Sequence, residues 1–357
     1  MPHLFDAYTV RGVTLRNRIA VSPMCQYWSD NGMASDWHLV HLGARAVGGA
    51  GLVIAEATAV SPEGRITPKD AGIWSDAHVP PLARITKFIK EYGGVPGIQI
   101  AHAGRKASTA PPYDKNSRGQ LSEADGGWLP MAPSPIPFND SDRPPRALTI
   151  DEIRKVQEEF RAATVRAREA GFGWVELHGA HGYLAHSFLS PLANQRKDEY
   201  GGSFENRIRF MLETARVMRR EWPDDKPMGT RLSVTDWMEG GWTVEESVEL
   251  AKRLKAEGVD LIACSSGAMS PRAKYPTGPG WQVPLSEAVR QGAQIATGAV
   301  GLIMEATHAA EIIQNGRADI VLLARELLRD PYWPFHAALK LGCRDALRLP
   351  KPYDYAV

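Results

Sequence analysis

Residues 175–184 read VELHGAHGYL and bring together three side chains that can hold or move protons. His178 and His181 are three residues apart, and Tyr183 follows two residues later. The apolar residues before the histidines predict a strand, and the glycines predict a loop after Leu177. Loops at strand ends carry function in many α/β proteins. Metal ligation, paired hydrogen-bond donation to one oxygen and a purely structural role all suit these histidines.

A catalytic zinc site usually has three protein ligands and one open position. The two histidines supply two ligands, Glu176 lies on the same side of its strand as His178, and Glu56 is the carboxylate found at a nearby strand end. One hypothesis is therefore a metal-dependent hydrolase that uses Glu56, His178 and His181. As paired donors, the imidazoles would instead polarise a carbonyl or stabilise an oxyanion, with Tyr183 as a nearby proton donor. The residues alone leave both alternatives open.

The elements that must position these residues alternate along the chain. The expected strands are 19–24, 51–57, 95–102, 172–178, 227–234, 259–266, 294–299 and 318–324. The expected helices are 36–49, 80–94, 149–171, 203–222, 243–258, 284–293, 305–316 and 333–342. About eight β–α units, with many strands apolar on both faces, favour an α/β fold of the (β/α)8 TIM-barrel type. A doubly wound open sheet is disfavoured because no GxGxxG follows the first strand.

Residues 103–148, after the third strand, are rich in Pro, Gly, Ser and Asp. This excursion is too long for a passive connection. We expect it to form a lid or subdomain on the C-terminal face of the barrel. No change of composition marks a domain boundary, so residues 1–357 are predicted to form a single domain.

The composition narrows the classes of partner. The chain has 357 residues, 43% hydrophobic and 23% charged, with a formal net charge of +1 and no basic run that would recruit nucleic acid. No stretch approaches the ~18 apolar residues of a membrane span, and the N-terminus does not resemble a signal peptide. The three cysteines, Cys25, Cys264 and Cys343, are too widely spaced for a disulfide framework or a CxxC metal site. We expect a cytoplasmic protein without a membrane partner.

Active sites of TIM barrels lie where strands end and βα loops begin. Gly301, which is expected to open a helix, follows the seventh strand, and Ala324 and Arg325 follow the eighth. Barrels often bind phosphate at these two places. The N–H groups at a helix start suit a dianion, and an arginine adds a permanently charged, bidentate partner. These residues predict an anionic cofactor.

Six motifs carry a resemblance to a known family: SPMCQY, EATAVSPEGRI, QIAHAGRK, HGAHGYL, DEYGGSFENR and LLARELLRDPYW. Together they resemble the Old Yellow Enzyme family, from about Leu4 to Pro352. The cysteine in SPMCQY and the EGRI stretch resemble the thermophilic-like, bacterial class of these flavin ene-reductases. The resemblance implies non-covalently bound FMN, with NADPH (less often NADH) as the hydride donor. It also implies a homodimer or homotetramer.

The resemblance assigns the cofactor contacts residue by residue. The isoalloxazine ring would be lined by Ser22, Pro23, Met24 and Cys25, and its pyrimidine end would be hydrogen-bonded by Ala57 and Gln99. The N1 and O2 atoms of the ring would lie by Arg231. The phosphate would be held by Gly301, Ala324 and Arg325.

The resemblance likewise assigns the substrate contacts. His178 and His181 would grip the substrate oxygen, Tyr183 would protonate the α-carbon after hydride reaches the β-carbon, and Tyr27 and Lys106 would also bind substrate. The implied activity is NAD(P)H-dependent reduction of the C=C of enones, maleimides, nitroalkenes and quinones. A metal-dependent hydrolase and a non-catalytic flavin-binding protein are the alternatives.

The C-terminal tail departs from the pattern of that class. There, this segment often reaches a neighbouring active site with an arginine or tryptophan. Here the tail reads LPKPYDYAV and contains neither, and Tyr355 falls near the expected position. Whether this tail reaches a neighbouring subunit is left open by the sequence.

Overall fold

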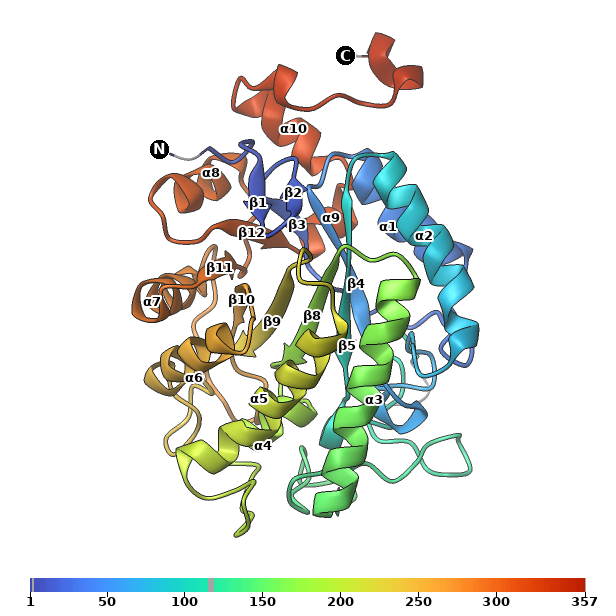
Figure 1. The fold of residues 1–357 in the computed structure, drawn as a ribbon, viewed down its shortest axis with the longest axis vertical. Helices are drawn as coiled ribbons and strands as arrows, with labels where there is room; N and C mark the ends of the chain where they lie inside the picture. The colour runs from blue at the N-terminus through green and yellow to red at the C-terminus, as the bar shows by residue number, and fades with distance from the viewer. Residues whose placement is uncertain (2, 115–118, 357) are drawn as a thin grey trace.

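The computed structural model describes residue 1 and residues 3–114 and 119–356 of the chain. Eight parallel strands close into a barrel in sequence order, with the last strand paired to the first (Figure 1). They are β3 (Ile19–Val21), β4 (Leu52–Ala59), β5 (Val95–Ala101), β8 (Trp174–Gly179), β9 (Met228–Ser233), β10 (Leu261–Ser265), β11 (Ala296–Ala299) and β12 (Ile320–Leu323). Each expected strand has its counterpart, and the predicted TIM barrel is confirmed.

Helices surround the barrel and follow its strands (Figure 1). The expected ones are present as α1 (Asp36–Val47), α2 (Val79–Glu91), α3 (Ile150–Glu169), α5 (Phe204–Glu221), α6 (Val244–Ala256), α7 (Val283–Ala293), α8 (Ala306–Gln314) and α10 (Trp333–Lys340). The start of α3 shows how sequence sets a boundary. The Thr149 hydroxyl accepts from the Glu152 N–H, and the Glu152 carboxylate accepts from the Thr149 N–H, which is a capping box.

Several short elements were not expected. Two helices directly follow barrel strands, and five 3₁₀ turns lie in loops or near the C-terminus. They are α4 (Leu184–Leu189), α9 (Arg325–Arg329), η1 (Pro62–Gly64), η2 (Asp76–His78), η3 (Gly104–Lys106), η4 (Arg344–Ala346) and η5 (Lys351–Ala356). Elements this short contain too few residues to show a hydrophobic period.

An N-terminal hairpin, β1 (Tyr8–Val10) with β2 (Val13–Leu15), also escaped prediction because its strands have three residues each. Its apolar side chains pack against the cluster that fills the barrel interior: Leu15, Ala20, Leu52, Ile54, Trp174, Leu261, Ala263, Val300, Ile320 and Leu322. The hairpin therefore closes the N-terminal end of the barrel. Ligands can therefore enter the barrel only at its C-terminal end, where the strands terminate.

The prediction that Gly301 opens a helix is wrong. Gly301 has φ +115°, far outside the helical region, and α8 begins only at Ala306. A Cβ at Gly301 would lie 3.0 Å from the Gln282 backbone nitrogen. The glycine therefore forms a bend pressed against the loop before α7, which a residue with a side chain would not fit without displacement.

The excursion at 103–148 contains little regular structure. Besides η3 it has two strands of two residues, β6 (Met131–Ala132) and β7 (Arg146–Ala147), paired in parallel. Residues 115–118 lie outside the described residues. Figure 1 shows the excursion at the end of the barrel where β5 and β8 terminate, while α10 and the C-terminus lie beyond the hairpin at the other end. Within the described ranges, no helix has both the length and the apolar character needed to cross a membrane.

Candidate active site

The three proton-holding side chains of HGAHGYL form one cluster at the C-terminal end of β8. The ring centroid of His178 lies 5.1 Å from that of His181 and 4.9 Å from that of Tyr183, and the last two are 6.4 Å apart. All three pairs meet nearly edge to face. The structure therefore brings together the residues that the sequence singled out first.

A tight turn at residues 180–183 makes this convergence possible. His181 and Gly182 have φ +61° and +74°, and the Tyr183 N–H donates to the Ala180 carbonyl at 3.2 Å. Two central residues with positive φ define a type I′ turn. Glycine is required at 182, because a Cβ there would lie 2.4 Å from the Ala268 carbonyl oxygen. Histidine tolerates the left-handed conformation better than most residues do.

Both histidines are held neutral. Burial and the positive charge of Arg231 hold the pKa of His178 and of His181 well below the usual range. A neutral imidazole has one N–H donor and one acceptor nitrogen. In His178 the acceptor is Nδ1, which receives the Ala180 N–H at 3.2 Å. The proton of His178 therefore lies on Nε2.

The hydroxyl of Ser265 decides the tautomer of His181. Ser265 Oγ lies 2.8 Å from His181 Nε2 and 3.5 Å from Gln282 Oε1. Gln282 Oε1 already accepts from Ser266 Oγ at 2.7 Å. Ser265 has one hydrogen to give, and if it donates to His181 Nε2, the nearer of its two possible acceptors, the proton of His181 lies on Nδ1. Each imidazole of the pair then offers one N–H group.

The phenols and the thiol near the cluster are held protonated. Burial raises the pKa of Tyr183 well above its usual value, and negative charge at Asp70 adds to this effect. Burial likewise raises the pKa of Tyr27 and of Cys25, whose side chains hydrogen-bond to each other. Tyr27 has φ +53°, and the Tyr113 hydroxyl donates to its carbonyl at 2.7 Å. These groups can give a proton at neutral pH but cannot act as bases.

Lys106, which the resemblance assigned to substrate binding, lies beside the cluster, but the sequence did not indicate its contacts with backbone oxygens. Its ammonium donates to the backbone carbonyls of His181 at 2.9 Å and Ala268 at 3.3 Å. It also lies 4.2 Å from the ring centroid of Phe138 and 5.4 Å from that of Tyr183. Burial lowers the pKa of Lys106 to about 8. Two of its three N–H groups are thus bound to backbone.

Glu56, the third ligand of the metal hypothesis, does not join the histidine pair. It is the extra residue in the pairing of β4 with β5, between Ala55 and Ala57, and such a bulge redirects a side chain. Its carboxylate accepts from the Gln26 N–H at 3.0 Å and lies 3.4 Å from His38 Nε2. Across the part of the chain that the structure describes, no three His, Cys, Asp or Glu side chains are grouped to hold a metal ion.

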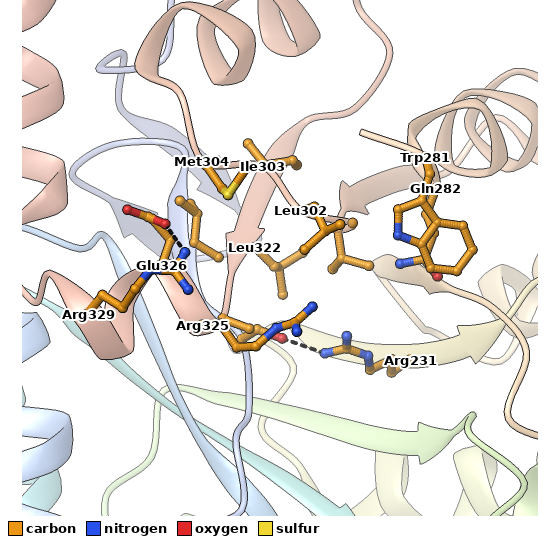
Figure 2. Close-up of a pocket in the computed structure, with 15 residues that line it drawn as sticks. Arg231, Trp281, Gln282, Leu302, Ile303, Met304, Leu322, Arg325, Glu326 and Arg329 are labelled. Atoms are coloured by element: carbon orange, nitrogen blue, oxygen red, sulfur yellow. Dashed lines mark hydrogen bonds and ion pairs between the residues drawn. The ribbon is translucent and has the colours of Figure 1, made fainter. Parts of the chain in front are cut away.

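A cavity of about 260 Å³ opens after β11 and β12 (Figure 2). Five of the residues predicted to bind the cofactor line it, although they are distant in sequence: Ser22, Arg231, Gly301, Ala324 and Arg325. The remaining lining residues are Trp281, Gln282, Val300, Leu302, Ile303, Met304, Leu322, Leu323, Glu326 and Arg329.

Two cations in this cavity form no ion pair with a described carboxylate, although the charge of Arg231 interacts with that of the buried Glu176. Arg231 is buried, donates from Nη1 to Ser22 Oγ at 2.7 Å, and has no partner for Nε. Arg325 has no hydrogen bond or ion pair with any described residue. Figure 2 shows both guanidinium groups turned into the same space, whereas Arg329 pairs with Glu326. Two unpaired arginines in one cavity favour an anionic ligand.

The other predicted cofactor residues end neighbouring strands. Pro23, Met24 and Cys25 are half-buried after β3, and Ala57 pairs in register with Gln99 across β4 and β5. Sequence reasoning missed the partner of Gln99. Its amide nitrogen donates to Glu176 Oε1 at 2.7 Å, with both side chains buried. Inward-facing polar residues on a barrel strand are the signal that could have found it.

These residues fit the phosphate and ribityl end of FMN. The bend at Gly301 leaves no room for a Cβ, the Nε of Arg231 is buried without a partner, and Arg325 is an unpaired cation. The protonated cluster after β8 provides donors at the same end of the barrel. The fold and this site together define a TIM-barrel protein that binds an anionic cofactor beside a set of buried proton donors.

Comparisons with known proteins give the family. Residues 3–342 match the model of the NADH:flavin oxidoreductase / NADH oxidase family, and the chain belongs to that family. An NADPH dehydrogenase of Geobacillus sp. (strain WCH70) is 51% identical over 341 residues, which cover 95% of this chain and 94% of the relative. An NADPH dehydrogenase of Geobacillus thermodenitrificans (strain NG80-2) is 47% identical over 353 residues, which cover 98% of this chain and 97% of the relative.

Solved structures agree with this assignment. Morphinone reductase superposes with a TM-score of 0.79 at 27% identity, covering 99% of this chain and 93% of its own. An old yellow enzyme homologue from Zymomonas mobilis superposes with a TM-score of 0.76 at 26% identity, and the match covers 95% of this chain and 93% of the homologue. A further structure shows morphinone reductase in complex with tetrahydroNAD. The resemblance to the Old Yellow Enzyme family is confirmed.

The protein is therefore an enzyme, an FMN-dependent oxidoreductase that uses a nicotinamide nucleotide. The alternative of a non-catalytic flavin-binding protein is set aside by this result. The metal-dependent hydrolase finds no support either, because its proposed third ligand faces α1.

Proposed function

We propose that the enzyme reduces the C=C bond of alkenes activated by a carbonyl or nitro group, with NADPH as the preferred electron donor. Enones, maleimides, nitroalkenes and quinones are the proposed substrates. The observation that carries this proposal is the pair of neutral imidazoles, each with one N–H to offer, beside a protonated phenol. The choice of NADPH is supported by the relatives named NADPH dehydrogenase.

The imidazoles activate the substrate in this proposal. His178 Nε2–H and His181 Nδ1–H donate to the substrate oxygen and withdraw electron density from the conjugated C=C. Preorganised donors of this kind stabilise the negative charge that develops on the oxygen. Neutral imidazoles are poor acids, so the proton for the α-carbon comes from Tyr183. FMN, when bound, would supply the hydride-transfer chemistry between the nicotinamide and the substrate.

The remaining contacts are proposed as follows. Gly301, Ala324 and Arg325 hold the FMN phosphate, and Ser22 with Arg231 lie next along the same cavity. Pro23, Met24, Cys25, Ala57 and Gln99 line the flavin ring, since they end strands β3, β4 and β5. Tyr27 offers a second phenol to the substrate, supported by its contact with Cys25.

We also propose that residues 103–148 cover the substrate as a lid of the single domain. Arg105 supports this role, because it is buried and donates to the carbonyls of Ile136, Pro137 and Met269. Assembly into a homodimer or homotetramer is a further proposal. Tyr355 is 91% exposed and belongs to η5 near the C-terminus, which Figure 1 shows beyond the hairpin end of the barrel, away from this chain's own site. Its side chain is therefore free to contact a neighbouring subunit in such an assembly.

Replacing His178 or His181 with alanine tests the donor pair. Either change should weaken binding of p-hydroxybenzaldehyde by about 10- to 150-fold, because a hydrogen bond to an ionised oxygen contributes about 1.5–3 kcal/mol. The bound phenolate gives a long-wavelength charge-transfer band, which allows direct titration. Unchanged titration curves, or activity that a chelator removes and zinc restores, would favour the metal-dependent hydrolase.

A further inference from the structure

The 180–183 turn is held by side chains rather than by the sheet. Each backbone N–H and C=O of His181 and Gly182 has a side-chain partner, and these partners come from the end of β9, from η3 and from α4. The His181 N–H donates to Ser233 Oγ at 3.0 Å, and the His181 carbonyl accepts from Lys106 Nζ at 2.9 Å. The Gly182 N–H donates to His186 Nδ1 at 2.9 Å, and the Gly182 carbonyl accepts from Ser187 Oγ at 3.0 Å.

Lys106 joins the turn to two other loops. It follows β5 in sequence, and its ammonium spans from the His181 carbonyl to the carbonyl of Ala268, after β10. Its stem covers Gly182, since a Cβ on that glycine would lie 3.2 Å from Lys106 Cδ. No described carboxylate forms an ion pair with Lys106. The cation is therefore committed to backbone oxygens around the turn.

His186 accepts a hydrogen bond from the turn, and its other ring nitrogen lies beside a buried carboxylate. It lies on α4 and is wholly buried, with Nε2 at 3.0 Å from Oδ1 of the equally buried Asp236. The other oxygen of Asp236 accepts from Ser190 Oγ at 2.5 Å and from the Trp242 N–H at 2.8 Å. Nδ1 accepts the Gly182 N–H, which leaves the ring proton on Nε2. The contact between Nε2 and Oδ1 does not have the geometry of a hydrogen bond, so Asp236 favours this proton through its charge.

We propose that Lys106, His186 and Asp236 are positioning residues, which hold His181 and Tyr183 in the geometry that grips and protonates the substrate. The inference rests on the roles proposed above for His181 and Tyr183. A left-handed conformation at a residue other than glycine persists when its surroundings over-determine it, and four side-chain bonds do so here. A displacement of about 1 Å in a reacting group can cost about 10²-fold in rate.

The test uses paired variants of the FMN-loaded enzyme. Lys106→Met and His186→Leu remove one bond to the turn while keeping most of the side-chain volume. Lys106→Arg retains a donor, and His186→Asn retains an acceptor near the position of Nδ1. We expect Lys106→Met and His186→Leu each to weaken p-hydroxybenzaldehyde binding and slow alkene reduction by about 10- to 100-fold. Lys106→Arg and His186→Asn should recover much of the affinity and much of the rate. All four variants should retain FMN.

The matched control is His78→Leu. His78 is also buried and accepts a backbone N–H through Nδ1, from Ser75 at 3.1 Å, but it makes no hydrogen bond to the turn. This variant should lose thermal stability without changing the affinity for the phenol. A role of His186 in stability alone would make the two histidine variants behave alike, which would overturn the proposal.

Two further outcomes would also overturn it. Folded, FMN-loaded Lys106→Met with unchanged phenol affinity and turnover would show that Lys106 does not position the turn. A loss confined to ligands with a second polar group would mean that Lys106 contacts the ligand directly, whereas a positioning role weakens all phenols alike. His181→Ala is measured in parallel, because an unchanged affinity in that variant would instead refute the proposed function.

Discussion

Replacement of Tyr183 by phenylalanine is expected to slow alkene reduction by about 10²–10⁴-fold, the usual contribution of a positioned proton transfer. Flavin reduction by NADPH should be almost unchanged, because that half-reaction takes no proton from Tyr183. Burial raises the pKa of this phenol, so it is protonated at neutral pH and ready to donate. The neutral histidines beside it do not replace it as an acid.

Stopped-flow measurement of the two half-reactions separates these effects. Enones should be affected most, because their α-carbon must be protonated, while quinones can take protons from water on their reduced oxygens. Tyr27→Phe is the matched control, since it removes the other phenol near Cys25. Equal slowing of both half-reactions in Tyr183→Phe would mean that Tyr183 shapes the pocket, and Tyr27 would become the next candidate for the acid.

Arg325→Ala should weaken FMN binding by about 10- to 150-fold, which corresponds to about 1.5–3 kcal/mol for a hydrogen bond to a charged group. Arg325 lines the cavity after β12 and has no ion-pair partner among the described residues, so its charge is available to a phosphate. Quenching of FMN fluorescence on addition of the apoprotein measures the dissociation constant directly.

Arg329→Ala provides the comparison, because Arg329 lines the same cavity but pairs with Glu326. Its loss should weaken FMN binding much less. If Arg325→Ala protein stays yellow through dilution and dialysis, with an unchanged dissociation constant, the phosphate does not lie at Arg325.

The sequence predicted the barrel well because helix and strand periods alternate and the strands are apolar on both faces. It missed the hairpin that closes the barrel, since a three-residue strand such as Tyr8–Val10 carries no measurable period. The bend at Gly301 was mistaken for a helix start because glycine suits both, and only the backbone dihedral distinguishes them. Local pattern thus identified elements but not the geometry of their connections.

In the site, the side chains of His178, His181 and Tyr183 lie together at the C-terminal end of a barrel strand, as the sequence predicted. What could not be predicted was the direction of individual side chains. A bulge directs Glu56 toward α1. Lys106 binds backbone oxygens because the tight turn after β8 and the loop after β10 meet beside it. Such contacts depend on tertiary packing between distant segments, which a single sequence does not encode locally.

The pairing of β12 with β3 has a consequence for how the protein matures in the cell. This pairing sets Leu323 opposite Val21, so the barrel cannot close until β12 has been synthesised. Ser22 and Arg325, which face the same cavity, come from the two sides of that final seam. A nascent chain that ends before β12 therefore has no complete site for the FMN phosphate. Cofactor loading is expected to follow closure of this seam, and its rate should depend on the supply of free FMN.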